Sequence, residues 1–221
     1  MNRFTFKTLG RVLLLTAVLV GTASAQKLIG TAKGRNETYT DDRRDSQQND
    51  RFTDRRDGQK YRTVRIGRQT WMAENLNYRT GASWCYKDDN SNCDKYGRLY
   101  DGNTATTVCP SGWHLPSREE WNDLVAVAGG NATAGKALKS TSSYWINRNG
   151  NGTDDYGFSA LPGGHRTTAG TFYNEGVSGY WYTATKCSGN SNCIKMISSG
   201  VTISDNYNWG YGMSVRCVAD D

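Results

Sequence analysis

Alternating apolar and polar residues mark the first regular element of the chain. Residues 61–67 are Tyr-Arg-Thr-Val-Arg-Ile-Gly, a two-residue period that predicts a half-buried β-strand. The Asp57-Gly58 pair before it favours a hairpin turn, and residues 69–72 are predicted as its partner strand. Ordered structure is therefore expected from about Phe52 onward.

A helical period appears later in the chain. Ser117 and Glu120 have the spacing of a capping box, in which each side chain accepts a hydrogen bond from the other residue's backbone amide. The apolar positions that follow share one helical face: Trp121, Leu124, Val125 and Ala128. We expect one main helix over about 117–128, a shorter helix over about 133–139, and short strands joined by turns after Tyr144.

Residues 1–25 have the three-part pattern of a secretory signal peptide. The parts are a positive region, an apolar run and a small-residue cleavage pattern: Arg3, Lys7 and Arg11, then residues 12–20, then Ala23-Ser24-Ala25. The apolar run is roughly half of the ~20 residues that a membrane-spanning helix needs. We therefore expect cleavage after Ala25, export, and no membrane span in the mature protein.

Residues 26–50 lack the apolar periodicity of a folded segment. Large apolar side chains are almost absent after Ile29, and mixed charges such as Asp42-Arg43-Arg44-Asp45 dominate. Such a segment buries too little apolar surface to fold by itself. We expect a disordered charged linker over 26–50, followed by one folded domain over 51–221.

The charge balance of the folded region disfavours nucleic-acid binding. The whole chain carries 27 basic and 21 acidic residues, and three of the basic ones lie in the signal peptide. From Tyr61 onward the count is nearly even, at 15 basic and 14 acidic residues. Domains that bind nucleic acid carry a clear positive excess, so we discount that class.

Six cysteines follow the signal peptide, and an even number in an exported chain predicts disulfides. Two pairs of them flank short polar loops, and both loops end in Asn-Ser-Asn-Cys. Local closure of both loops leaves the remaining two cysteines to pair, which gives Cys85–Cys93, Cys187–Cys193 and Cys109–Cys217. A zinc site is disfavoured because the chain has no Cys-x-x-Cys pair and only two histidines.

A series of motifs runs in order through the folded region: Gly67-x-Gln69-Thr70-Trp71-Met72-Ala73-Glu74-Asn75-Leu76-Asn77-Tyr78, Tyr96-Gly97-Arg98-Leu99-Tyr100, Cys109-Pro110-Ser111-Gly112-Trp113-His114-Leu115-Pro116, Asp155-Tyr156-Gly157-Phe158-Ser159-Ala160-Leu161-Pro162-Gly163-Gly164 and Ser214-Val215-Arg216-Cys217-Val218. Together they resemble the Fibrobacter succinogenes major paralogous domain, a family found in surface and secreted proteins. The resemblance covers about Phe52 to Asp220. The resemblance to this family does not by itself imply a biochemical function.

The start of the main helix adds a second resemblance. Leu115-Pro116-x-x-x-Glu120-Trp121 is similar to a stretch of formylglycine-generating-enzyme-like domains, which have a C-type-lectin-like fold. This similarity implies an α+β domain with few helices and a twisted antiparallel sheet, stapled by disulfides. It also implies that Cys109 pairs with Cys217 on the last strand, the pair that loop spacing leaves.

No group of residues predicts catalysis. Nucleophilic catalysis needs a nucleophile, a base and an orienting group in contact, and neither His114 nor His165 lies in such a motif. Both histidines are therefore interpreted as structural. Oxidoreductase chemistry like that of the formylglycine-generating enzymes needs reactive cysteines, which the predicted disulfides would remove, and a shared fold does not carry function.

Calcium is the one cofactor that the sequence suggests. The stretch from 147 to 155 alternates oxygen-bearing side chains, and its candidate ligands are Asn149, Asn151, Asp154 and Asp155. The spacing is not that of an EF-hand, and Asn-Gly pairs also form ordinary turns. We therefore expect either a turn or a calcium site here, and no other cofactor.

Aromatic side chains gather in the C-terminal half. Flat rings stack on sugar faces, and neighbouring Asn and Asp side chains can bond to hydroxyl groups. The candidate ligand-binding rings are Tyr207, Trp209, Tyr211, Trp181 and Tyr182. The alternative is that these rings form part of the core, where Trp and Tyr pack routinely.

The sequence as a whole favours a non-enzymatic module that is secreted or held at the cell surface. Export, disulfides and aromatic loops indicate binding or adhesion, with an extracellular polysaccharide or a surface protein as the partner. Two alternatives remain, an oxidoreductase related to the formylglycine-generating enzymes and a structural subunit of an extracellular assembly.

Overall fold

The computed structural model describes residues 50–146, 152–186, 192–197, 200–204 and 207–221. The predicted signal peptide, the linker up to residue 49 and the predicted Cys187–Cys193 disulfide lie outside the described part. The described elements, in chain order, are β1 (Arg51–Thr53), β2 (Lys60–Ile66), β3 (Gln69–Met72), β4 (Ser83–Trp84), the 3-10 helix η2 (Tyr86–Asp88), α1 (Asn90–Tyr96), β5 (Leu99–Tyr100), α2 (Gly102–Ala105), β6 (Trp113–His114), α3 (Arg118–Val127), α4 (Ala134–Leu138), β7 (Gly163–Arg166), β8 (Phe172–Glu175), β9 (Gly179–Lys186), β10 (Asn192–Ile197), β11 (Val201–Ser204), β12 (Met213–Ser214) and β13 (Val218–Ala219).

The hairpin expected at the start of the domain is present. β1 pairs with β2 across the turn that contains Gly58, whose φ of 78° lies in the left-handed region that glycine adopts without strain. β2 pairs in turn with β3, with Val64 opposite Trp71. The strands predicted at 61–67 and 69–72 are confirmed to within one residue at each end.

The capping box confirms the main helix. The Ser117 hydroxyl accepts a hydrogen bond from the Glu120 amide at 3.1 Å, and the Glu120 carboxylate accepts one from the Ser117 amide at 2.7 Å. The helix that follows, α3, buries its apolar face, and Trp121 is only 1% exposed. The shorter predicted helix corresponds to α4.

The expectation of only two helices is wrong, because the described part of the chain has four. The clearest addition is α1, which overlaps the polar loop that the sequence predicts between Cys85 and Cys93. Asp89 caps it by accepting a hydrogen bond from the Ser91 amide at 2.9 Å. Only Cys93 and Tyr96 are buried on this seven-residue helix, so its sequence shows almost no apolar period.

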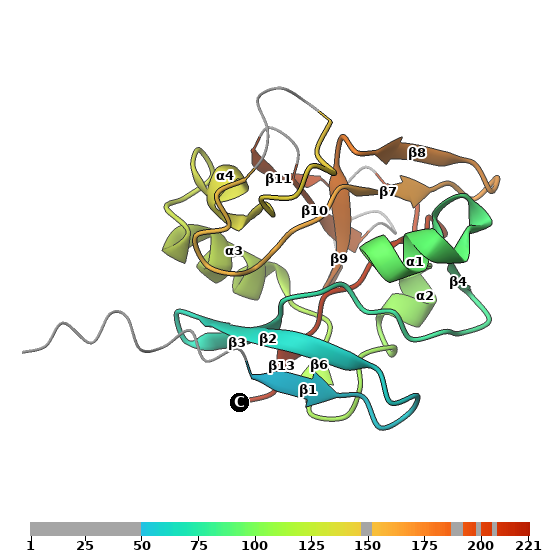
Figure 1. Ribbon diagram of the computed structural model, residues 1–221, viewed down its shortest axis with the longest axis horizontal. Helices are drawn as coiled ribbons and strands as arrows, with labels where there is room; N and C mark the ends of the chain where they lie inside the picture. Colours follow the sequence, from blue (N-terminus) through green and yellow to red (C-terminus); the bar gives the residue numbers. More distant parts are fainter. Residues whose placement is uncertain (1–49, 147–151, 187–191, 198–199, 205–206) are drawn as a thin grey trace, which may run out of the picture. The chain divides into compact units, whose positions relative to one another are not determined.

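The second resemblance implies one antiparallel sheet, but the described part of the domain contains two sheets (Figure 1). The first has the strand order β1-β2-β3-β13-β6 and is antiparallel throughout. The second has the order β11-β10-β9-β12-β5-β4, with β7 joined to β9 and β8 to β7. It is a mixed sheet, because β9 pairs in parallel with both β12 and β7.

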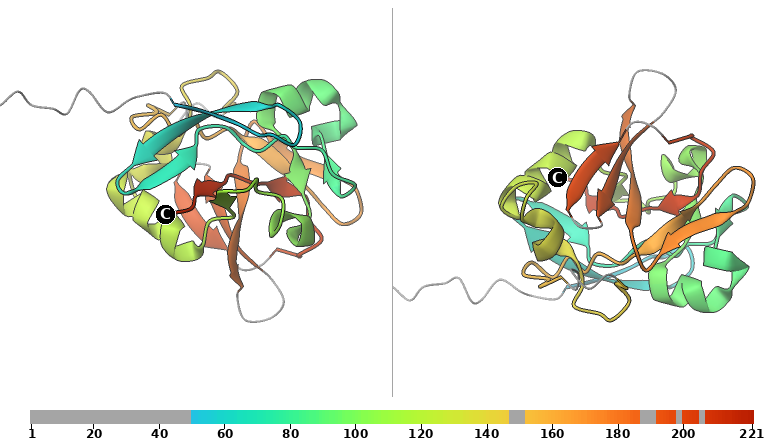
Figure 2. Two further views of the ribbon diagram at one scale, coloured as in Figure 1. Left: turned by 90° about the horizontal axis from the view of Figure 1, so that it is seen from below. Right: turned by 90° about the horizontal axis from the view of Figure 1, so that it is seen from above.

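The C-terminal segment links the two sheets. It contributes β12 to the second sheet and β13 to the first, and Figure 2 shows this red segment from two further sides. A disulfide joins Cys217, just before β13, to Cys109, and Cys217 is completely buried. The predicted link between the middle of the domain and its C-terminus is confirmed.

Aromatic side chains dominate the core. Trp71 of β3, Trp121 of α3 and Phe158 pack with ring centroids 5.0 to 5.9 Å apart. Trp181 of β9 extends the cluster, 6.2 Å from Trp121. Trp113 of β6 is only partly buried, and its ring packs against Phe52 of β1. Within the described residues, no helix combines the length and apolar character that a membrane crossing requires.

Candidate functional site

Two of the five candidate aromatic rings belong to the interior of the domain. Trp181 and Tyr182 are 0% and 1% exposed. The Trp181 indole donates a hydrogen bond to the Asn75 side-chain oxygen at 2.8 Å, and the Tyr182 hydroxyl donates one to the Tyr211 carbonyl at 2.7 Å. Neither ring can present a face to a ligand, so both residues are part of the core that the other three candidate rings pack against.

The other three rings lie over the tyrosines of β9. Tyr207, Trp209 and Tyr211 are each partly buried. Trp209 is edge-on to Tyr182, with centroids 5.5 Å apart, and its indole donates to the Asn103 side chain at 2.6 Å. Because its ring also rests against Gly102, Trp209 is committed to packing.

Tyr207 and Tyr211 join two further tyrosines around His165, and we call this group of five residues the tyrosine cluster. Its members are His165 of β7, Tyr173 of β8, Tyr180 of β9, Tyr207 and Tyr211. His165 is stacked between Tyr173, at 5.9 Å, and Tyr211, at 5.7 Å. The other two tyrosines meet it edge-on, at 4.7 and 6.0 Å. Residues from three strands and one loop therefore build a single aromatic unit.

Tyr173 is the open end of this unit. It lies directly opposite His165 in the β7–β8 pair and is 50% exposed, although stacking fixes the orientation of its ring. The next residue, Asn174, has a φ of 65° and donates its side-chain amide to the Tyr180 hydroxyl at 2.7 Å. The left-handed backbone at Asn174 thus ties the exposed strand to the buried tyrosine.

Burial disfavours the charged form at two members of the tyrosine cluster, His165 and Tyr207. Burial lowers the pKa of His165, and its Nδ1 has no hydrogen-bond partner within the described part of the chain. Burial raises the pKa of Tyr207 to about 12, and the neighbouring Tyr180 and Tyr211 act in the same direction. The surface can therefore offer ring faces and neutral hydroxyl groups, which suits an uncharged ligand with apolar and hydroxylated faces.

The sequence pattern singled out Tyr207 and Tyr211 but missed Tyr173 as a site residue. Its signal was weak, because Phe172–Glu175 is a short strand without a clear two-residue period. His165, for which the sequence predicts a structural role, lies at the centre of the cluster. Only the pairing of β7 with β8 and β9 brings these rings together.

The second histidine is held by two carboxylates. His114 Nδ1 lies 2.7 Å from Asp220 and its Nε2 lies 2.8 Å from Glu120. Burial lowers the pKa of His114, but the hydrogen bonds to these two carboxylates outweigh it, and the net shift is upward. With both ring nitrogens engaged by acids, His114 links β6 to α3 and to the C-terminal residues.

The candidate calcium ligands are only partly described. Asn149 and Asn151 lie outside the described residues, so the predicted set of four is not tested as a whole. Asp154 accepts hydrogen bonds from the Ser159 amide at 2.7 Å and the Ser159 hydroxyl at 2.6 Å, and Asp155 is exposed. Across the described ranges, no cluster of three or more His, Cys, Asp or Glu side chains is suited to hold a metal ion.

Among the described residues, two of the three predicted disulfides are seen, and the third, Cys187–Cys193, is not tested. Cys85 pairs with Cys93 across 8 residues, and Cys109 pairs with Cys217 across 108. Both predictions are confirmed. The disulfides are consistent with an extracellular protein, because such bonds persist in oxidising compartments.

These features define a class of protein: a disulfide-stapled α+β domain with two sheets and an aromatic surface cluster. The family model of the Fibrobacter succinogenes major domain matches residues 64–219, and the chain belongs to that family. The resemblance inferred from the motifs is thereby confirmed. No curated protein and no solved structure matches the chain.

Proposed function

We propose that this protein is an exported, non-enzymatic binding module that recognises neutral polysaccharide through the tyrosine cluster. In this proposal the signal peptide directs secretion, and the mature domain acts outside the cell or at its surface. We also propose that the two-sheet domain is a variant of the C-type-lectin-like fold. The cluster lies on β7, β8, β9 and the 207–211 loop.

The observation that carries the proposal is the position of Tyr173. A tyrosine that is 50% exposed usually samples several orientations, but this ring is stacked on His165, which is stacked on Tyr211. Fixing the ring before a ligand arrives lowers the entropy cost of binding. The side chain therefore has the properties of a stacking platform.

The charge of the cluster supports the choice of ligand class. Its five members are four tyrosines and one histidine, and burial lowers the pKa of the histidine. The cluster therefore offers no fixed charge to an acidic or basic polymer. A neutral sugar ring has an apolar face that stacks on an aromatic ring and hydroxyl groups at its edge. Asn174, which is exposed beside Tyr173, can reach such hydroxyl groups.

Retention on insoluble polysaccharides tests the proposal. The secreted protein should bind at least one neutral polysaccharide, and Tyr173→Ala should weaken binding about tenfold, which corresponds to ~1.4 kcal/mol. Tyr173→Phe keeps the stacking face and should retain most of the affinity. Ile146→Ala removes another exposed apolar side chain, one that is 71% exposed, and should have no effect.

Two outcomes would contradict the proposal. One is the absence of retention on every neutral polysaccharide and every spot of a glycan array. The other is retention that Tyr173→Ala leaves unchanged, which would place binding on a different surface.

A further inference from the structure

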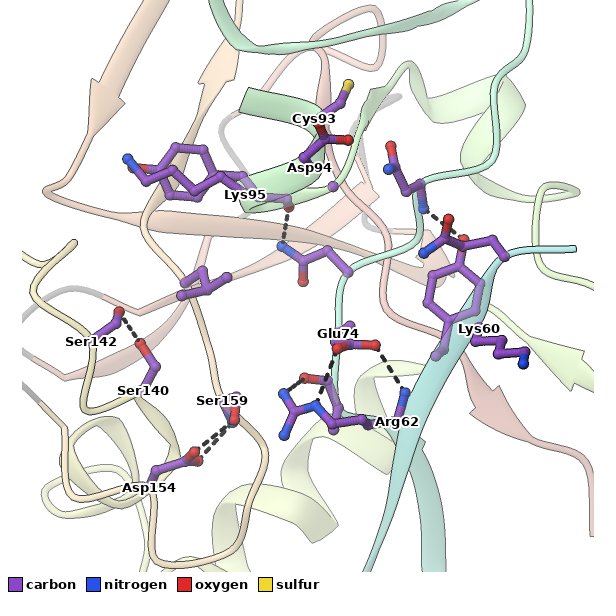
Figure 3. Close-up of a pocket in the computed structure, with 18 of the residues that line it drawn as sticks. Lys60, Arg62, Glu74, Cys93, Asp94, Lys95, Ser140, Ser142, Asp154 and Ser159 are labelled. Atoms are coloured by element: carbon purple, nitrogen blue, oxygen red, sulfur yellow. Dashed lines mark hydrogen bonds and ion pairs between the residues drawn. The ribbon is translucent and has the colours of Figure 1, made fainter. Parts of the chain in front are cut away.

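A polar pocket lies apart from the tyrosine cluster. It has a volume of about 370 Å³, within the range of small-molecule sites, and none of the five cluster residues lines it. Five chain segments form its walls: residues 59–62, 73–77, 93–97, 140–142 and 154–161. Figure 3 shows the side chains that these segments direct around it.

Asn75 gives the pocket a rigid floor. Its side-chain oxygen accepts hydrogen bonds from the Trp181 indole at 2.8 Å and from two nitrogens of Arg216 at 2.7 and 3.0 Å. Its amide nitrogen donates to the Tyr96 carbonyl at 2.8 Å. Gly97 allows the close approach, because an added Cβ there would lie 2.8 Å from the Asn75 Cβ. All these partners are fixed before any ligand binds, which favours specific recognition.

Carboxylates and hydroxyl groups form part of the lining above this floor. Glu74 accepts hydrogen bonds from the Arg62 backbone and side chain at 2.9 and 3.1 Å, and Asp154 accepts two from Ser159. A pair of serines continues the wall, with the hydroxyls of Ser140 and Ser142 2.8 Å apart. Carboxylate oxygens accept more than one hydrogen bond each, so these groups keep capacity for a ligand.

The charges around the pocket cancel. The lining holds three basic and three acidic side chains: Lys60, Arg62 and Lys95 against Glu74, Asp94 and Asp154. A strongly anionic or cationic ligand is therefore not selected by net charge. A ligand that both donates and accepts several hydrogen bonds fits this mixture of carboxylates, hydroxyls and ammonium groups.

We propose that this pocket is a second ligand site, which binds one neutral monosaccharide unit. Adjacent sugar hydroxyls can donate to the carboxylates of Glu74 and Asp154 and accept from the serine hydroxyls. Leu161 supplies an apolar patch for the carbon face of the ring. The pocket differs in kind from the tyrosine cluster, because it surrounds a small ligand whereas the cluster offers a flat face to a long chain.

One wall of the pocket is formed by α1, and this wall depends on the Cys85–Cys93 disulfide. The helix and the residue after it contribute five consecutive lining residues, Cys93 to Gly97. A helix of seven residues is not stable by itself in water. The disulfide therefore holds the wall in place for binding.

Saturation-transfer NMR with free glucose, galactose, mannose and N-acetylglucosamine tests the site on the secreted protein. At least one sugar should show transfer, and Ser142→Phe, which fills the pocket, should weaken its binding at least tenfold. Ser143→Phe is the matched control, because Ser143 is exposed and does not line the pocket. Glu74→Gln should also weaken binding while the fold is kept, as judged by a cooperative thermal transition.

The two binding proposals fail separately. The absence of transfer from all four sugars at about 10 mM would overturn the pocket site, because an affinity that weak is below that of ordinary specific recognition. Equal loss in Ser142→Phe and Ser143→Phe would overturn it too. Glucosamine, a cationic sugar, is measured alongside the four neutral ones, and stronger binding of glucosamine than of glucose would overturn the neutral class. Tyr173→Ala should leave monosaccharide binding unchanged and affect only the retention on polysaccharide.

Discussion

Asn75 shows how one residue can decide the stability of the interior. Arg216 is completely buried, and its guanidinium donates to the Asn75 side chain and to the Phe158 carbonyl. It also lies over the Phe158 ring, 4.3 Å from the centroid. Burial lowers the pKa of Arg216 to about 9, and the nearby Asp154 and Glu74 carboxylates oppose the shift. Of its three described hydrogen bonds, two therefore depend on Asn75.

Replacing Asn75 should therefore cost far more than replacing its neighbour. Asn75→Ala removes two acceptor contacts from a buried guanidinium and one from Trp181, and we expect a loss of about 3–5 kcal/mol in the free energy of unfolding. Asn77→Ala is the control, because the Asn77 side-chain oxygen has no described partner, and it should cost less than about 1 kcal/mol. Urea denaturation with intact disulfides measures both. Equal losses in the free energy of unfolding would show that the hydrogen bonds of Asn75 do not have this special importance.

The two histidines should affect stability in opposite directions as pH changes. The pKa of His114 is raised in the folded state, so its stabilising contribution is complete below the unfolded value of about 6.5 and is lost as pH rises through the folded pKa. The pKa of His165 is lowered, so its contribution is present above about 6.5 and is lost as pH falls through the folded pKa.

Melting temperatures from pH 5 to 8 test this pair of residues. His114→Gln should remove part of the decline toward high pH, and His165→Gln should remove part of the decline toward low pH. Each variant serves as the control for the other. If both variants have pH profiles parallel to the wild type, the proposed protonation linkage is absent.

At the scale of elements, α3 is specified by local sequence signals, whereas α2 depends on tertiary packing. α3 has a capping box and an apolar face, and both are visible in its sequence. α2 is a four-residue helix that begins at Gly102, and it rests against Trp209 more than 100 residues later. The Gly102 amide donates to the Trp209 carbonyl at 2.8 Å. This short helix is therefore held by a distant loop.

Gly102→Ala separates helix propensity from packing. Alanine favours a helix by about 1 kcal/mol over glycine, but its Cβ would overlap the Trp209 ring. We expect a net destabilisation of about 1–3 kcal/mol and a change in tryptophan fluorescence. Gly81→Ala has open space around its Cβ and should show neither effect. A more stable Gly102→Ala protein would show that Trp209 moves aside freely.

For the whole molecule, the two described disulfides act over very different lengths. Cys85–Cys93 closes a loop of 8 residues, whereas Cys109–Cys217 closes one of 108 and fixes the segment that joins both sheets. The entropy lost by the unfolded chain grows with loop length. The longer link should therefore contribute more to the stability of the domain.

Paired serine variants measure this difference. Replacing both Cys109 and Cys217 should lower the free energy of unfolding by about 4–5 kcal/mol, and replacing both Cys85 and Cys93 by about 2–3 kcal/mol. Urea denaturation under identical conditions compares them. A larger loss from the shorter link would mean that native packing around α1, and not chain entropy, sets the order.

The sequence by itself determined the features whose signals are local: the β2–β3 pair, the capped helix α3, the family, and the two described disulfides, whose pairing followed from short loops and elimination. It could not reveal α1, whose buried residues are too few to give a period, or the second sheet with its parallel pairings. Only the tertiary structure decided the candidate sites. His165 meets Tyr211, and Asn75 meets Arg216 141 positions away, because strand order brings them together. Such contacts leave no local pattern in the sequence, because the two partners lie far apart along the chain.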